Sequence, residues 1–330
     1  MGMNRRGFLR QASRIALAGS AMSLSQAARG QVQGDKSMQP SLPIVDTHQH
    51  LWDLSKFKLP WLRPPLDRSF TVQDYHEAIR GLHIVKAVYM EVAVVAEQRL
   101  QEAEYVIGLC KEADNVTRAA VIAGSPADEG FESYIMRFKG NPYIKGVRGT
   151  FSSVKQMSDK QVLRNLHLLG KLGLRFDLNV PPQSLPEAAR LVEQCPDTRF
   201  VLDHCGNADP VAFFPVSRAG PRAAQHSPQQ WKQDIDKLAA QRNIICKISG
   251  LVDNVTGYRL TVEDLTPVID HCLDAFGPER VVFAGDWPVC LIGMPLWDWV
   301  GLLKDVVAAR PIAEQRKLFH DNAIRFYDLG

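Results

Sequence analysis

The chain has 330 residues, of which 45% are hydrophobic and 23% are charged. This composition is that of a globular protein able to bury one large core or two smaller ones. The 39 basic and 36 acidic residues leave a net charge of +3 and form no long basic run, which argues against a nucleic-acid partner and favours a small-molecule one. The composition is compatible with a homo-oligomer and does not decide it.

The N-terminus differs from the rest of the chain. Residues 4–10, NRRGFLR, contain paired arginines and precede a weakly apolar segment, 15–24, and small residues around Ala27. This order is typical of an export signal, and the paired arginines resemble the twin-arginine type. We predict a signal peptide over 1–27, a linker over 28–42, passage through the twin-arginine export machinery and a periplasmic or extracellular location. A disordered basic tail is the alternative, and the apolar segment is too short for stable membrane insertion.

The six cysteines are interpreted as buried thiols rather than disulfides. None belongs to a C-x-x-C pair, and most lie within apolar runs, as buried thiols do. They are Cys110, Cys195, Cys205, Cys246, Cys272 and Cys290.

From residue 43 onward, short β-branched runs alternate with segments of helical period, which predicts a βα repeat with a parallel sheet. Eight such strands over 43–330 fit a single α/β domain, a (β/α)8 TIM barrel. An open doubly wound sheet is the alternative, weakened because no G-x-G-x-x-G and no Walker-type loop is present. The candidate strands are Ile44–Thr47, Ile84–Glu91, Thr117–Ala123, Ile144–Thr150, Leu174–Val180, Arg199–Asp203, Asn243–Ser249 and Arg280–Ala284.

Three helix starts carry capping signals. The segments 158–161 and 184–187 each match the capping box, in which a serine and a residue three positions on satisfy the first turn. Thr261 is followed by Glu263 and Asp264, which places acid where the helix dipole favours it.

In such a barrel the active face lies at the carboxyl ends of the strands. His48 and His50 stand one residue apart at the end of the first strand, so their side chains point to the same side. His204 and Asp286 follow the sixth and eighth strands. This set can hold one divalent metal, or it can polarise a carbonyl and transfer a proton without metal.

The segments VDTHQHLWD, VRGTF, VLDHCGNAD, KISGL, AGDWPV and NAIRFYDL occur in order along the chain. With them the chain resembles the amidohydrolase-related family, in the branch that includes sugar lactonases and the pyrone-dicarboxylate lactonase. The resemblance covers residues 43–329 and implies a (β/α)8 barrel with hydrolysis at the strand carboxyl ends. It makes His48 and His50 the first-strand pair, His204 the sixth-strand histidine and Asp286 the catalytic aspartate.

Two departures from the family bear on its metal. Binuclear and several decarboxylating relatives resemble each other in a histidine after the fifth strand, where this chain has Asp177-Leu178-Asn179. No bridging lysine ends the fourth strand. We therefore expect at most one metal, with zinc as the first choice, held by His48, His50, His204 and Asp286, and a metal-free mechanism stays open.

Other polar residues on the active face have two interpretations each. Arg148 is a candidate clamp for a substrate carboxylate or hydroxyl pair, or it pairs with a neighbouring acid. Glu91 is a candidate substrate or ligand contact, or it forms a structural salt bridge. Lys247, if it points into the barrel, needs a partner such as Asp177.

The aromatic residues beside this centre are equally open. Trp52 and Trp287 are candidates to stack against a sugar ring, with loop packing as the alternative. His226, in the long loop after the sixth strand, is a weaker candidate for substrate contact.

These residues predict a hydrolase of a cyclic carboxylic ester, a sugar lactone or a related lactone. Asp286 takes a proton from water, and a histidine cluster or one metal polarises the carbonyl. A decarboxylase of an unsaturated or aromatic acid and a catalytically idle sugar-binding barrel are the alternatives.

Overall fold

The computed structural model describes residues 42–218, 222–253, 255 and 257–330. The predicted signal peptide, and the predicted linker apart from residue 42, lie outside the described residues and stay predictions. In the part that is described, no helix combines the length and the apolar character needed to cross a membrane.

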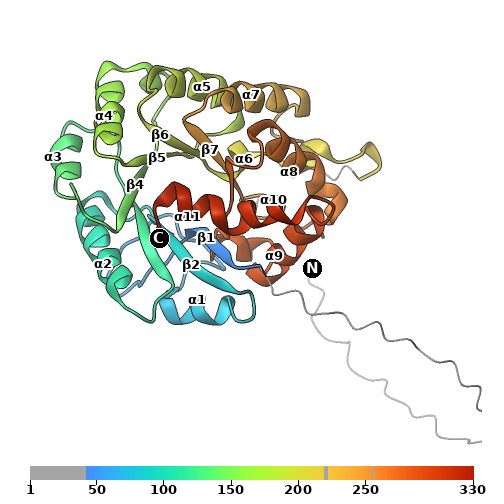
Figure 1. The fold of residues 1–330 in the computed structure, drawn as a ribbon, viewed down its shortest axis with the longest axis horizontal. Coiled ribbons are helices and arrows are strands. Elements are labelled where there is room, and N and C mark those ends of the chain that lie inside the picture. The colour runs from blue at the N-terminus through green and yellow to red at the C-terminus, as the bar shows by residue number, and fades with distance from the viewer. Residues whose placement is uncertain (1–41, 219–221, 254, 256) are drawn as a thin grey trace, which may run out of the picture. The chain divides into compact units, whose positions relative to one another are not determined.

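Eight parallel strands form one sheet in the order of the sequence, β1 to β8. The barrel closes where Gln49 bridges Trp287 in parallel and the His50 N–H donates to the Trp287 carbonyl at 2.8 Å. The (β/α)8 barrel is confirmed, and the open-sheet alternative is wrong (Figure 1). The strands are β1 Ile44–Gln49, β2 Ile84–Met90, β3 Thr117–Ala123, β4 Ile144–Gly149, β5 Arg175–Leu178, β6 Arg199–Leu202, β7 Ile244–Ile248 and β8 Val281–Phe283.

Helices surround the strands, and short 3-10 turns join them. The helices are α1 Val72–Ala78, α2 Arg99–Lys111, α3 Phe131–Met136, α4 Lys160–Lys171, α5 Leu185–Gln194, α6 His204–Asn207, α7 Pro228–Ala240, α8 Val262–Phe276, α9 Leu296–Val306, α10 Ile312–Arg316 and α11 Asn322–Tyr327. The 3-10 turns are η1 Ala96–Gln98, η2 Val154–Ser158, η3 Pro182–Ser184, η4 Pro210–Phe213, η5 Val216–Arg218 and η6 Val289–Ile292, and the π-turn η7 Lys317–Asp321 precedes α11.

One of the three predicted helix caps forms as expected. The Thr261 N–H donates to Asp264 Oδ2 at 2.7 Å at the start of α8. For α4 the prediction is wrong by one residue, because Asp159 is the N-cap and accepts from the Gln161 N–H. Ser184 precedes α5 without a side-chain cap bond, because a 3-10 turn leads into that helix.

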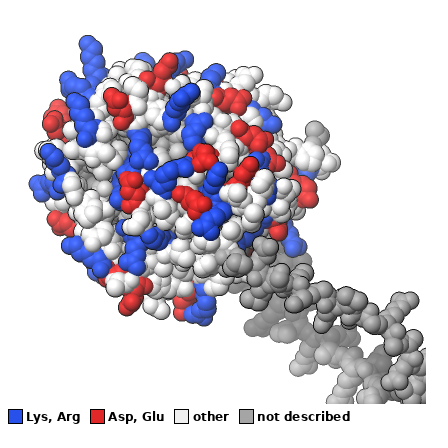
Figure 2. Space-filling view, viewed as in Figure 1, with Lys and Arg blue, Asp and Glu red and all other residues white. Residues whose placement is uncertain are grey.

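The C-terminal segment closes the amino-terminal end of the barrel. Phe326 and Leu329 pack with interior residues such as Val45 and Val201, and α11 lies across this end in Figure 1. Figure 2, drawn from the same side, shows basic and acidic side chains interspersed over this face. The carboxyl ends of the strands are thus the end left for a site.

The six cysteines are buried and free of disulfides. This confirms their interpretation as thiols.

Candidate active site

The predicted cluster assembles at the carboxyl end of the barrel. His48 Nε2 lies 3.1 Å from His50 Nε2, and Asp286 Oδ1 lies 3.5 and 3.4 Å from these two nitrogens. His204 Nδ1 lies 3.8 Å from Asp286 Oδ2. All four side chains are buried. Three imidazoles therefore surround one carboxylate, although they come from positions far apart in the chain.

Unusual backbone conformations present two of these side chains. His204, Cys205, Gly206 and Asn207 all have φ between +51° and +65°, so α6 is a left-handed turn, and Asp286 has φ +52°. The left-handed conformation costs a non-glycine residue roughly 1–2 kcal/mol. Such outliers cluster at functional sites, where the surrounding structure holds them in place.

Asp46 fixes the first strand against the loop that carries Asp286. Its carboxylate accepts from the His48 N–H at 3.0 Å, from the Gly285 N–H at 2.7 Å and from the Tyr75 hydroxyl at 2.7 Å. Sequence reasoning did not assign a role to this aspartate. Its position two residues before the histidine pair was the available signal.

A buried charge cluster lies beneath the histidines. Lys247 Nζ lies 2.5 Å from Asp177 Oδ2, 3.0 Å from Asp203 Oδ1 and 3.3 Å from His48 Nδ1. The predicted pairing of Lys247 with Asp177 is confirmed. Asp203, the second partner of the lysine, was missed, although its alternation with the interior residue Val201 pointed it into the barrel.

The burial of this cluster determines which groups are charged. Burial acts to raise the pKa of Asp203, but the Lys247 ammonium and His48 hold it well below its ordinary value. Burial, together with repulsion by Asp203, raises the pKa of Asp177. Burial opposes the charge of Lys247, yet the two carboxylates raise its pKa. The Lys247 ammonium thus keeps Asp203 ionised, whereas Asp177 beside it holds its proton more readily than an ordinary aspartate.

Arg148 pairs with an acid. Its Nε donates to Glu91 Oε1 at 2.6 Å, one Nη donates to the Glu91 carbonyl at 2.9 Å, and the other lies 3.3 Å from His48 Nε2. These contacts are those of a salt bridge between Glu91 and Arg148, as the second interpretation of each residue predicts. The guanidinium still reaches the histidine cluster, so a substrate role for Arg148 stays a prediction.

The two tryptophans pack as core residues. Trp52 is 1% exposed, donates its indole N–H to the Arg68 carbonyl at 2.6 Å and packs edge-on against Phe70. Trp287 is 2% exposed and packs against Phe70 and Tyr75. These contacts fit the loop-packing alternative, and stacking of either ring on a sugar stays a prediction.

His226 has both ring nitrogens engaged in its own loop. Its Nε2 accepts from the Asp209 N–H at 2.8 Å, and Nδ1 lies 3.1 Å from the Ser227 carbonyl. Its ring also stacks on Trp231. This favours a structural role.

Burial shifts the pKa values of the three histidines and of Asp286 in opposite directions. Burial lowers the pKa of His50 to about 3, lowers that of His48 well below its usual range and also lowers that of His204. Burial raises the pKa of Asp286 to about 6. At neutral pH the site therefore holds neutral imidazoles around an ionised carboxylate, which is the state required of a general base.

The donor set fits one metal ion. Ligand atoms about 2.1 Å from a common ion in tetrahedral geometry lie roughly 3.4 Å apart, close to the spacing of the His48, His50 and Asp286 atoms. His50 Nδ1 lies 3.0 Å from the Met90 carbonyl, so it donates there and leaves Nε2 free to bind a metal. A second ion beside Asp203 would meet the Lys247 ammonium, which supports the expectation of at most one metal.

His204 depends on a neighbouring glycine for its position. Gly250 has φ +63°, and a Cβ built on it would lie 2.5 Å from the His204 Cβ. His204 Nδ1 lies 3.0 Å from the Ser249 hydroxyl. We expect Gly250→Ala to destabilise the fold by about 1–3 kcal/mol, from overpacking and a strained φ. Urea unfolding measures this loss, with Gly108→Ala on α2 as the control, because a Cβ there meets nothing within 4 Å. Equal stability of the two variants would contradict the proposed support of His204.

Comparison with known proteins places this barrel in a family. A family model described as Amidohydrolase matches residues 45–329. The chain belongs to the amidohydrolase family. Among curated proteins this amidohydrolase is 26% identical over 298 residues to L-fucono-1,5-lactonase of Burkholderia multivorans, covering 86% of the chain and 96% of the relative. It is 23% identical over 225 residues to L-rhamnono-gamma-lactonase of Scheffersomyces stipitis, covering 61% and 65%.

The fold of this amidohydrolase also matches solved structures. An amidohydrolase from Burkholderia multivorans, solved with bound zinc, superposes with a TM-score of 0.75 at 23% identity and covers 87% of this chain and 100% of that one. This likeness supports the barrel independently of the strand pattern.

Proposed function

We propose that this amidohydrolase hydrolyses the ring ester of a sugar lactone or a related organic-acid lactone. The observation that carries the proposal is the Asp286 carboxylate, buried among three neutral imidazoles at the open end of the barrel. The two lactonases that the chain resembles over much of its length support the substrate class.

The chain's own residues account for each step of ester hydrolysis. Asp286 takes a proton from water while the water oxygen attacks the carbonyl carbon. In this mechanism the carbonyl oxygen lies beside His204 and Arg148, whose N–H groups would stabilise the negative charge that develops on it. The ring C–O bond then breaks, and the alkoxide that leaves takes the proton from Asp286. The product is a hydroxy acid, so water is the sole co-reactant.

We infer that one divalent ion, with zinc as the first choice, binds His48, His50 and Asp286. When bound, such an ion would polarise an ester carbonyl and lower the pKa of water. His204 was also predicted as a ligand. Its Nδ1 faces Ser249 Oγ at 3.0 Å, which leaves Nε2 as the nitrogen that would bind the ion or polarise the carbonyl.

We further propose that the enzyme works outside the cytoplasm. The paired arginines of residues 4–10 and the apolar segment that follows support export by the twin-arginine route, with cleavage near Ala27.

A panel of aldonolactones with a pH indicator tests the activity, because each hydrolysis releases an acid. We expect turnover of at least one lactone and no release of carbon dioxide from unsaturated or aromatic acids. Running the panel with and without a chelator, beside metal analysis, tests the ion. Activity that falls with chelator and returns with zinc supports the metal, and activity that persists in metal-free protein removes it from the mechanism. Carbon dioxide release without lactone turnover would replace the proposal with a decarboxylase.

A further inference from the structure

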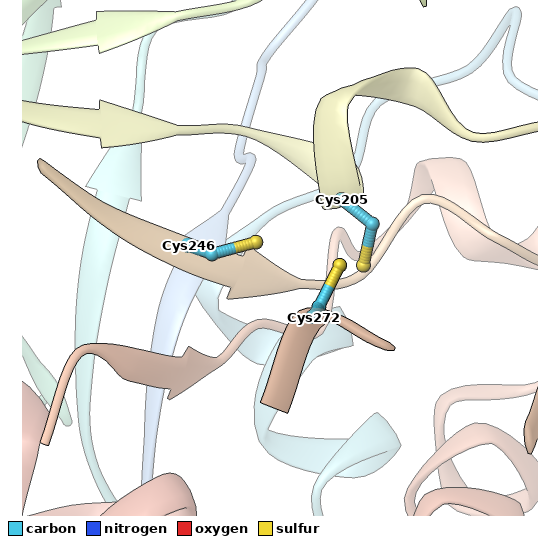
Figure 3. Close-up of side chains that lie close together, drawn as sticks. All are labelled: Cys205, Cys246 and Cys272. Atoms are coloured by element: carbon cyan, nitrogen blue, oxygen red, sulfur yellow. The ribbon is translucent and has the colours of Figure 1, made fainter. Parts of the chain in front are cut away.

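Three of the six cysteines meet outside the active site. Cys205 lies in the left-handed turn α6, Cys246 lies in β7 and Cys272 lies in α8, and all three are fully buried. Figure 3 shows their sulfur atoms directed toward one another from these elements. The three sulfurs all lie within 4.8 Å of one another.

The fold places these thiols on the side of the sheet opposite the active site. Successive side chains of a strand point to opposite faces, so Lys247 points into the barrel while Cys246 points out toward the helices. The thiols of Cys205 and Cys246 both face the Lys247 carbonyl, at 3.6 and 3.7 Å. The cluster is therefore distinct from the His48, His50 and Asp286 set, with one β-strand between them.

The spacing of the sulfurs suits a single ion bound by three of them. Sulfurs at a metal–sulfur distance of about 2.3 Å in trigonal geometry lie roughly 4 Å apart. The thiols at Cys205, Cys246 and Cys272 are separated by no more than 4.8 Å, which is close to that spacing.

We propose that Cys205, Cys246 and Cys272 form a trigonal site for one soft monovalent metal ion, Cu(I). Thiolate sulfur selects soft ions such as Cu(I) and zinc. Structural zinc almost always takes four protein ligands, whereas the described residues group only three sulfurs here. Cu(I) accepts three-sulfur coordination, so the count of donors favours it.

Binding exchanges protons for the ion and transfers no electrons. Each S–H bond that is replaced by an S–Cu bond releases one proton to solvent, and copper stays in the +1 state. The ion must enter while the segment around α6 opens or while the chain folds, because the sulfurs are fully buried. The site does not depend on the proposed lactonase activity.

Anaerobic transfer of Cu(I) from its bicinchoninate complex tests the site, using the folded full-length chain and the same chain refolded with the complex present. We expect one equivalent bound, with X-ray absorption giving three sulfur neighbours at about 2.3 Å, as in other metal–thiolate bonds. Binding only after refolding also supports the site and shows a barrier to entry. No binding in either preparation overturns the proposal.

Matched variants assign the binding to these sulfurs. We expect Cys272→Ala to weaken Cu(I) binding at least tenfold, while Cys195→Ala, which removes a buried thiol outside the cluster, retains it. Cys272→Ser serves the same purpose with less change in volume if the alanine variant folds poorly. Equal binding by Cys272→Ser and Cys195→Ala, or nitrogen neighbours in the X-ray absorption of the wild type, would place the copper elsewhere and refute the assignment.

Discussion

Replacing Asp286 by asparagine is expected to lower kcat/KM for a lactone by about 10²–10⁴, the range for a lost proton-transfer group. This corresponds to roughly 3–5 kcal/mol of transition-state stabilisation. The amide is nearly isosteric with the carboxylate but does not take a proton from water. Initial rates over the lactone panel measure the loss, and circular dichroism shows whether the barrel is retained.

Asp305→Asn is the matched control for this prediction, because it makes the same chemical change at an exposed position on α9. We expect it to leave the rates unchanged. An Asp286→Asn variant as active as Asp305→Asn would remove Asp286 as the base and leave the histidines to activate water.

The pH profile of the wild type provides a second test of the same residue. Burial raises the pKa of Asp286 to about 6, and only the ionised carboxylate takes a proton. If activity persists after metal removal, kcat/KM should fall about tenfold per pH unit below that pH, where the carboxyl holds its own proton, and should reach a plateau above it. A profile that is flat between pH 5 and pH 7 would contradict a base with this pKa.

The fold could be predicted because each strand is a short apolar run between polar or glycine-rich segments. The fifth strand shows where this stops: residues 174–180 were predicted, and the strand runs from Arg175 to Leu178. Beyond Leu178 the chain bonds to Asn207 rather than to a neighbouring strand, because the Asn207 amide donates to Asn179 Oδ1 and to the Val180 carbonyl, both at 2.8 Å. A contact between residues 28 positions apart leaves no local signal.

The sequence predicts the polar residues of the site. It predicts less well how the side chains around them pack. Strand alternation and strand-end position predict that His48 and Asp286 lie close together. Because a lone buried ammonium is costly, the sequence also predicts a partner for Lys247. The second partner, Asp203, depends on how neighbouring strands are staggered around the barrel. The packing of Trp287 depends on Phe70, which lies in the long loop after β1. The sequence does not indicate the path of that loop. Side-chain direction in such loops follows from tertiary packing.

Lys247→Met is expected to destabilise the fold by about 3–5 kcal/mol, the cost of breaking a buried ion pair by removing one partner. The methionine fills a similar volume, but Asp177 and Asp203 then lie buried without their cation. Urea unfolding at pH 8 measures the loss. Lys160→Met, which removes an exposed lysine from α4, is the control and should stay within about 0.5 kcal/mol of the wild type.

The pH dependence of this loss separates charge from packing. In the wild type, Lys247 and His48 hold the pKa of Asp203 below its unfolded value, so the stability from this carboxylate is present above that unfolded value and is lost as the pH falls through the folded one. In Lys247→Met the uncompensated carboxyls should instead have folded pKa values above the unfolded ones, so protonation stabilises the variant at low pH. Asp177, whose pKa burial and Asp203 already raise in the wild type, gains stability on protonation in both proteins. Because Asp203 gains it only in the variant, the difference from wild type should be smaller at pH 5 than at pH 8. A loss that is equal at both pH values would mean that Lys247 acts by filling space, and Asp177 and Asp203 would then be neutral in the folded protein.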